Sequence, residues 1–145
     1  MTSVLTRMVS RALLAPTLMV AAGVLVKGYS DVGDGFAAGT IAALGILLQY
    51  VALGREQVVA ALPISRAPAL AMAGLAVGVA VLAVPVLAGG APLEHWPPAG
   101  DDPVYVGSVE LISAVAFDVG VSALVLGAAV TIIDAVAARP DGERP

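Results

Sequence analysis

The sequence predicts an all-α membrane protein with four transmembrane helices and both termini in the cytoplasm. Its 145 residues are 59% hydrophobic and 12% charged, with a mean hydropathy of +0.98, which is too apolar for a soluble domain of this size. Four apolar segments are each long enough to cross a hydrocarbon layer of about 30 Å, which takes about 20 helical residues. The distribution of lysine and arginine predicts the orientation. We therefore expect residues 1–145 to form a single integral membrane domain.

The first two predicted spans cover about residues 8–26 and 36–53. Arg11 lies near the start of the first span, where a long side chain can reach the lipid headgroups. The second span contains no charged residue. A basic start followed by Ala-Ala-Gly at residues 21–23 also fits a cleaved signal peptide, which is the alternative to a first span. The apolar stretch continues to Val26, beyond that cleavage site, and three further spans would keep the protein in the membrane either way.

The last two predicted spans cover about residues 67–91 and 108–136. The third contains no charged residue. Pro68 fits its first turn, and Pro85 is expected to bend or end it. The fourth is different because Asp118 lies inside it. A carboxylate in the hydrocarbon layer costs about 3 kcal/mol even on the gentler insertion scale, so Asp118 should face protein or water.

Asp118 and Glu110 are predicted to form a polar site in the fourth span. They lie eight residues apart, which in a helix is about 12 Å along the axis and about 80° around it, so both could line one broad face. Two acids staged from the outer surface inward are what an access path for a proton or a cation requires. The alternative is that Asp118 only hydrogen-bonds a neighbouring helix, for example through Ser122 or a lysine of a companion protein.

Basic residues lie almost entirely on one side of the predicted spans. Lys27 alone falls on the opposite side, where we expect it to reach the outer interface or to act as a charge partner for Asp31 or Asp34. This bias places both termini in the cytoplasm. The six basic residues of the inner side are Arg7, Arg11, Arg55, Arg66, Arg139 and Arg144.

Glycines cluster in the polar link before the second span, which reads KGYSDVGDGFAAG. Gly33 and Gly35 can adopt positive φ and so allow a tight turn. Gly35 and Gly39 also have GxxxG spacing at the start of the second span, and Gly74 and Gly78 repeat it in the third. Such strips of small residues let another helix backbone approach closely, so we expect them to serve helix packing. The alternative is that glycine and alanine are simply frequent in this composition.

Two stretches resemble one known family. GYSDVGDGFAAGTIAALGILLQYVALG is similar to the glycine-rich segment and following helix of the MrpB (or MnhB) component of Mrp-type multisubunit Na⁺/H⁺ antiporters. GSVELISAVAFDVGVSALVLGAAVTII resembles the last helix of that family, whose mark is Phe-Asp-hydrophobic-Gly-Val and which here includes Gly120, a further predicted packing residue. The resemblance covers the whole chain. This sequence departs from the family at Tyr29, where histidine is usual, at Val32, where proline is common, and at Asp34, in place of a glycine.

The resemblance implies a small component of a hetero-oligomeric complex in a bacterial or archaeal cell membrane. Such complexes exchange cytoplasmic Na⁺ for external H⁺ and are related to the membrane arms of respiratory complex I and membrane-bound hydrogenases. Its partners would be the other antiporter subunits and the lipid bilayer. In that family pumping is attributed mainly to the large antiporter-like components, so MrpB would contribute helix packing, part of an ion or proton access path, or both.

Other functional classes find little support in the sequence. There is no cysteine, no metal-ligand spacing, no phosphate loop and no nucleophile–base arrangement, so we expect neither an enzyme nor a bound metal or cofactor. The acidic balance, net charge −4, makes nucleic acid an unexpected partner. The alternatives are a stand-alone four-helix proton-coupled exporter of small molecules and a passive assembly protein of a related hydrogenase or complex I-like assembly. The exporter is disfavoured because the first span has no acid and the chain is only 4% aromatic.

Overall fold

The computed structural model describes residues 3–27, 33–91, 105–106, 109–110 and 113–138. Within this part of the chain, four helices are long and apolar enough to cross a membrane. The prediction of an all-α membrane protein with four spans is therefore confirmed. The long helices are α1 (Val4–Lys27), α2 (Asp34–Leu53), α4 (Ala67–Leu87) and α5 (Ser113–Ala137).

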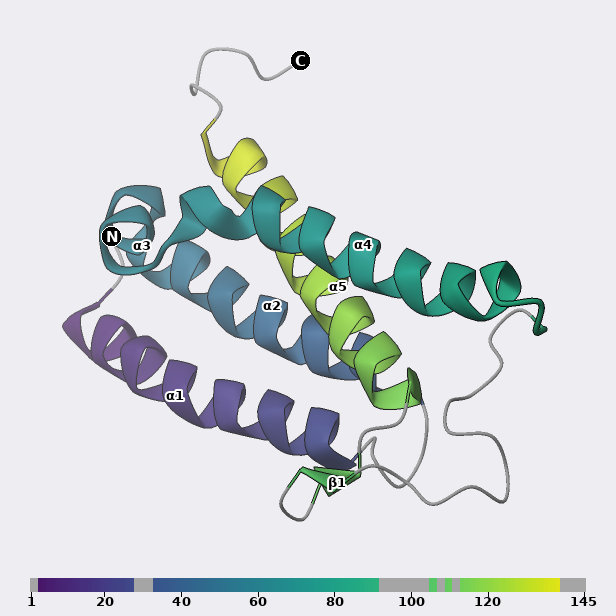
Figure 1. Cartoon of the computed structure of the whole chain (residues 1–145). Coiled ribbons are helices and arrows are strands. Elements are labelled where there is room, and N and C mark those ends of the chain that lie inside the picture. Colours follow the sequence, from purple (N-terminus) through teal and green to yellow (C-terminus); the bar gives the residue numbers. More distant parts are fainter. Residues whose placement is uncertain (1–2, 28–32, 92–104, 107–108, 111–112, 139–145) are drawn as a thin grey trace.

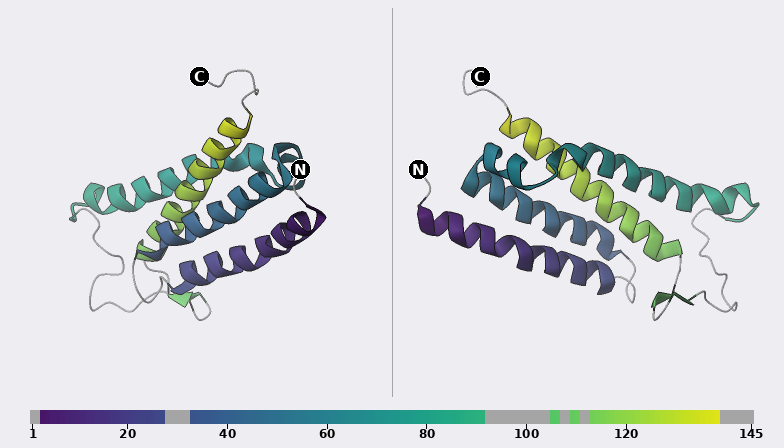
Figure 2. Two further views of the ribbon diagram at one scale, coloured as in Figure 1. Left: turned by 180° about the vertical axis from the view of Figure 1, so that it is seen from behind. Right: turned by 60° about the vertical axis from the view of Figure 1, so that its left-hand side comes forward.

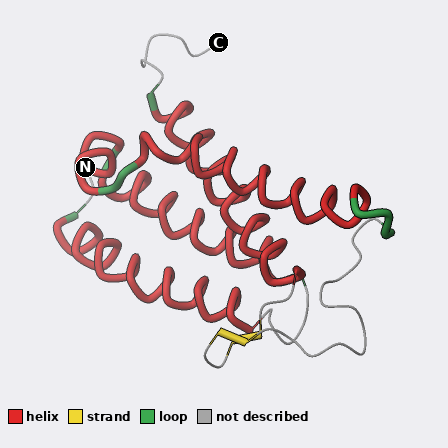
Figure 3. Tube along the Cα trace, in the orientation of Figure 1, coloured by secondary structure: helices red, strands yellow, loops and turns green. Residues whose placement is uncertain are grey.

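Shorter elements connect the long helices. The link between α2 and α4 contains a two-turn helix, α3 (Arg55–Ala61), and a 3-10 turn, η1 (Ile64–Arg66), neither of which the sequence predicted. Two short strands, β1 (Tyr105–Val106) and β2 (Val109–Glu110), pair antiparallel before α5. Figure 3 shows the strands close to the last turn of α1 and the first turn of α5, away from α3.

The long helices lie side by side in the order α1, α2, α5, α4 (Figure 1). The main contacts join α1 to α2, α2 to α5, and α5 to α4, so the two outer helices each pack against one long neighbour. In Figure 2, α1 begins and α5 ends at the same end of the bundle, where α2 ends and α4 begins. The outer helices are consequently little covered: only 11% of the apolar window of α1 and 6% of that of α4 is buried, against 44% for α2.

Two helix boundaries follow from local backbone chemistry. α2 begins at Asp34, two residues earlier than predicted, because Gly33 takes φ 119° and serves as its N-cap. α4 ends at Leu87 rather than at residue 91. Pro85 lies inside its last turn, and Gly89 turns the chain after the helix with φ 89°. The prediction that Pro68 lies in the first turn is confirmed.

A small hydrophobic cluster closes the end of the bundle where α3 lies. Val58 of α3 is almost completely buried there, and Ile64 of η1 packs into the same cluster. Their partners come from three long helices, namely Tyr50, Ala67 and Val130. The link between α2 and α4 is therefore folded against the bundle.

Glycine sets the spacing between α4 and α5. A Cβ on Gly74 would lie 3.0 Å from the carbonyl carbon of Ala123, and one on Gly120 would lie 3.0 Å from the carbonyl oxygen of Gly74. These are backbone contacts that a side chain cannot relieve by rotating. Gly78 differs, since a Cβ there would meet only the Phe117 ring, at an ordinary distance of 3.9 Å. The two helices therefore touch backbone to backbone at the first glycine of the strip, whereas a side chain at the second would have room beside the Phe117 ring.

We expect Gly74→Ala to destabilise the bundle and Gly78→Ala to leave it nearly unchanged. The first substitution forces α4 and α5 apart, and overpacking of this kind costs about 2 kcal/mol. The second adds a methyl group where there is room for it. Unfolding of the two variants in mixed detergent, followed by circular dichroism, measures the difference. Equal losses of stability would contradict the packing of α4 on α5.

Candidate functional site

Asp118 is a buried carboxylate on α5. Its residue is 5% exposed, and its Oδ2 accepts a hydrogen bond of 3.2 Å from the backbone N–H of Gly33. Gly33 is the N-cap of α2, so the donor belongs to the start of that helix. The sequence analysis gave hydrogen bonding between Asp118 and a neighbouring helix as an alternative to an ion path. Such a bond is present in the structure, and its donor is a backbone N–H in place of a side chain.

The start of α2 is a suitable environment for this negative charge. The first N–H groups of a helix have no partner within the helix, and the helix dipole leaves partial positive charge at the same end. Gly33 itself has no side-chain cap, so the carboxylate of Asp118 reaches across from α5 to a group that α2 leaves unpaired. The interaction joins residues 85 positions apart.

Glycine allows α2 to come this close. Gly35 lies in α2 with its Cα against the backbone of α5, and a Cβ there would be 2.8 Å from the Cα of Asp118. One turn later, a Cβ on Gly39 would be 2.7 Å from the carbonyl oxygen of Ser122. The expectation that Gly35 supplies positive φ to the turn is wrong, since within the described residues positive φ is found at Gly33, Gly54 and Gly89. Gly35 serves close approach instead.

Glu110 does not share a helix with Asp118. It lies in β2, paired with Tyr105 of β1, and α5 begins only at Ser113. The prediction of two acids on one helical face is wrong in this respect, because Val109 and its valine and tyrosine neighbours form a strand pair, a conformation that β-branched and aromatic residues favour. The side-chain position of Glu110 lies outside the described residues.

Lys27 ends α1 and faces the start of α2. Its Nζ lies 4.0 Å from Oδ2 of Asp34, the first residue of α2. The Lys27 side chain is 70% exposed, so this long ion pair contributes little to stability. Asp31, Tyr29 and Val32 lie outside the described residues.

A second carboxylate of α5 is held at the opposite end of the helix. Asp134 accepts hydrogen bonds of 2.9 Å and 3.1 Å from the guanidinium of Arg55 on α3, and one of 2.9 Å from the hydroxyl of Tyr50 on α2. Arg55 and Tyr50 are 79 and 84 positions away from Asp134, so no local signal could reveal the network.

The paired guanidinium keeps its charge. The hydrogen bonds to Asp134 raise the pKa of Arg55 above its usual value. Because Arg55 opens α3, the ion pair also fixes α3 against the end of α5.

Gln49 is a further polar residue buried between helices. Its side-chain nitrogen donates a 2.7 Å hydrogen bond to the backbone carbonyl of Ser10 on α1. This bond joins α1 to α2 near the end at which α3 lies.

Among the described residues, no group of three histidine, cysteine, aspartate or glutamate side chains could hold a metal ion. The two carboxylates of α5, Asp118 and Asp134, lie apart along the helix. Both are held by donors from α2 or from the α3 that follows it.

Residues 5–131 match the family described as a domain related to the MnhB subunit of Na⁺/H⁺ antiporters. This match covers most of the chain, including all four long helices except the end of α5. The chain belongs to the MnhB-related family. The resemblance carried by its two sequence motifs is confirmed, and the MnhB-related chain is a multi-pass membrane protein.

A curated relative of this MnhB-related chain is a probable K⁺/H⁺ antiporter protein of Rhizobium meliloti (strain 1021), named as its A/B component. The two are 35% identical over 127 residues, which is 83% of this chain and 12% of the relative. The MnhB-related chain thus spans only about an eighth of the length of the relative.

We expect Asp134→Asn to loosen α3. The substitution removes the charge that Arg55 pairs with, and so weakens the charge-assisted hydrogen bonds that hold α3 against α5. Trypsin should then cleave the α3 segment faster in detergent solution. Asp34→Asn is the matched control, because the pair that it breaks is long and exposed. The network is not structural if both variants are cleaved at the same rate.

Proposed function

We propose that this chain is a small membrane component of a monovalent cation/proton antiporter complex, and that Asp118 forms part of an ion or proton access path in it. The family description names Na⁺/H⁺ antiporters and the relative is named as a K⁺/H⁺ antiporter, so the proposal covers both cations. The observation that carries it is a buried carboxylate inside an apolar membrane helix.

Capping of α2 does not by itself account for a carboxylate at this position. Asparagine or serine could accept the same bond from Gly33 without charge, and an acid in the hydrocarbon layer costs about 3 kcal/mol on the gentler scale. Unlike asparagine or serine, an acidic side chain can also take up and release a proton or a cation. The start of α2 places partial positive charge beside this carboxyl group. In this proposal Glu110 remains the second candidate acid, nearer the outer surface.

Partner proteins are proposed from the coverage of the bundle and from the relative. α1 and α4 each pack on one long neighbour and leave most of their apolar surface uncovered. In the relative the matching segment is a small part of a much longer antiporter chain. We propose that the present chain packs beside a large antiporter protein of that kind. The packing glycines Gly35, Gly39, Gly74 and Gly120 are already used inside the chain, whereas the surroundings of Gly78 are more open.

The proposed orientation has both termini in the cytoplasm of a bacterial or archaeal cell. One end of the bundle contains the start of α1, the end of α2, α3 and the start of α4 (Figure 1). Four arginines belong to these segments, namely Arg7, Arg11, Arg55 and Arg66, whereas Lys27 is the last residue of α1 at the other end. Positive residues favour the cytoplasmic side. Asp118 then lies toward the outer side and the Tyr50–Arg55–Asp134 network at the inner side. The role proposed is transport and not catalysis of a covalent reaction.

We expect Asp118→Asn to lower antiport in everted vesicles at least tenfold while the complex still assembles. Asparagine keeps the size of the side chain and an acceptor for Gly33 but removes the charge. Asp118→Ala also removes the acceptor and should cost about 1 kcal/mol of stability, as loss of a helix cap does. Asp34→Asn, at a half-buried acid at the same end of the bundle, serves as control. Full antiport in Asp118→Asn, or loss of assembly in that variant, would support a purely structural role.

A further inference from the structure

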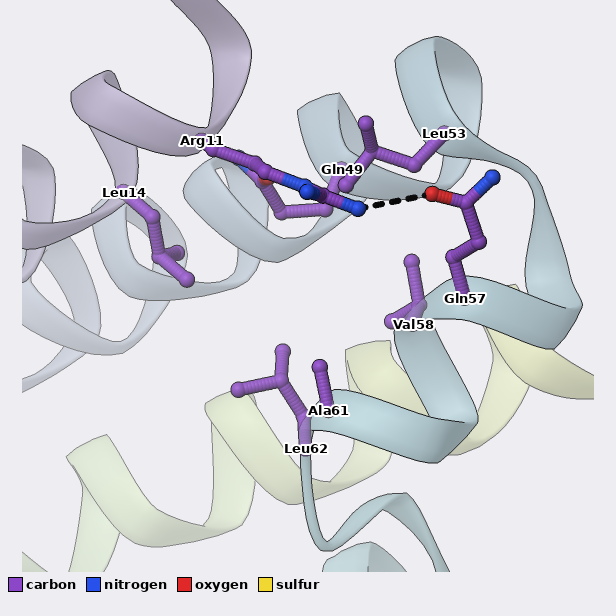
Figure 4. Close-up of a pocket in the computed structure, with 8 residues that line it drawn as sticks. All are labelled: Arg11, Leu14, Gln49, Leu53, Gln57, Val58, Ala61 and Leu62. Atoms are coloured by element: carbon purple, nitrogen blue, oxygen red, sulfur yellow. Dashed lines mark hydrogen bonds between the residues drawn. The ribbon is translucent and has the colours of Figure 1, made fainter. Parts of the chain in front are cut away.

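An open cavity of about 150 Å³ lies between α1 and α3, at the end of the bundle that carries the arginines (Figure 4). We refer to it as the α1–α3 cavity. α2 forms its back wall. Residues that line it include Arg11, Leu14, Leu53, Gln57, Ala61 and Leu62.

Arg11 is the one charged residue among those that line the α1–α3 cavity in the described part of the chain. Figure 4 shows its side chain extending from α1 toward α3, where Nη2 donates a 2.8 Å hydrogen bond to Oε1 of Gln57. Because this acceptor is a neutral amide, the bond positions the guanidinium without neutralising its charge. Gln57 thus holds a positive group at a cavity whose remaining lining is apolar except for Gln49.

The walls and the charge together indicate the kind of molecule that fits. The apolar side chains of the lining offer a water molecule few hydrogen-bond partners, and Gln49 and Gln57 already bond to the Ser10 carbonyl and to Arg11. Water alone therefore fills such a space poorly. The guanidinium presents paired donors in a planar arrangement that suits phosphate oxygens. The cavity lies near the first turns of α1 and the end of α2, which is the depth of lipid headgroups if these helices cross the bilayer. Basic pockets between membrane helices at this depth suit anionic headgroups.

We propose that the α1–α3 cavity binds one anionic phospholipid, with its phosphate on Arg11 and the first part of its acyl chains against Leu14 and Leu62. The lipid fills the gap that separates α1 from α3. Gln57 is a positioning residue, since it acts on the phosphate through Arg11. This inference depends on the helices spanning a bilayer and not on the proposed transport activity.

The test uses the tagged chain purified in detergent with the proteins that accompany it, stripped of lipid and titrated with phosphatidylglycerol under native mass spectrometry. Arg11→Gln should weaken phosphatidylglycerol binding about fivefold, the factor that corresponds to about 1 kcal/mol for one basic group near an anionic surface. Arg7→Gln removes the same charge one turn earlier on α1, outside the cavity lining, and should change binding less than twofold. Arg11→Lys keeps the charge without the paired donors and should fall between.

Ala61→Phe provides a second test, because it fills the cavity and leaves Arg11 in place. It should also weaken phosphatidylglycerol binding, with helix content unchanged by circular dichroism. Phosphatidylcholine should bind weakly to every variant, and inorganic phosphate should not displace phosphatidylglycerol.

Three results would overturn the proposal. Equal effects of Arg7→Gln and Arg11→Gln would mean general attraction to an anionic surface. Displacement by inorganic phosphate alone would identify a free anion as the ligand. Loss of a companion protein from Arg11→Gln, with lipid binding unchanged, would mean that a protein carboxylate occupies the site. None of these readouts depends on ion transport, so they are independent of the outcome for Asp118.

Discussion

The close approach of α2 to α5 is the constraint on which the other features depend. Gly35 and Gly39 bring the backbone of α2 into contact with that of α5 over the first turns of α2. α5 is thereby held between α2 and α4, and the four helices form a row in place of a closed bundle. Only with this spacing can Asp118 of α5 reach the N–H of Gly33 at the start of α2.

α2 and the α3 that follows it also supply the hydrogen-bond donors for the two acids of the apolar helix α5. Asp118 and Asp134 lie about 24 Å apart along α5 at 1.5 Å per residue, close to the thickness of the hydrocarbon layer. Each finds donors supplied by α2 or its continuation: a helix start at one end, and the hydroxyl of Tyr50 with the guanidinium of Arg55 at the other. Buried charge is tolerated where such partners are fixed in advance. α5 therefore contributes two acidic side chains, Asp118 and Asp134, to a predominantly apolar set of helices.

A row of four helices has two exposed flanks, and this shapes how the protein meets its surroundings. α1 and α4 present apolar surfaces that lipid or companion chains must cover. The folded link between α2 and α4 adds the α1–α3 cavity on one flank, where Arg11 provides positive charge beside leucine side chains. Membrane helices associate through close packing and not through exclusion of water, so small and uneven surface features of this kind have strong effects on assembly.

The sequence by itself determined the membrane class, the number of spans, the helix start at Pro68 and the singular position of Asp118, because hydropathy, proline stereochemistry and charge act locally. The motif that carries the family resemblance, Phe117 to Val121, lies in the same helix as Asp118. Only the tertiary structure decided the partner of Asp118, the Tyr50–Arg55–Asp134 network, the role of Gly35 and the strand conformation of Glu110. The first two depend on contacts between residues 79 to 85 positions apart, and the last on a strand pairing that overrides the helical pattern. Such contacts are set by how helices pack in space, which no local pattern of residues encodes.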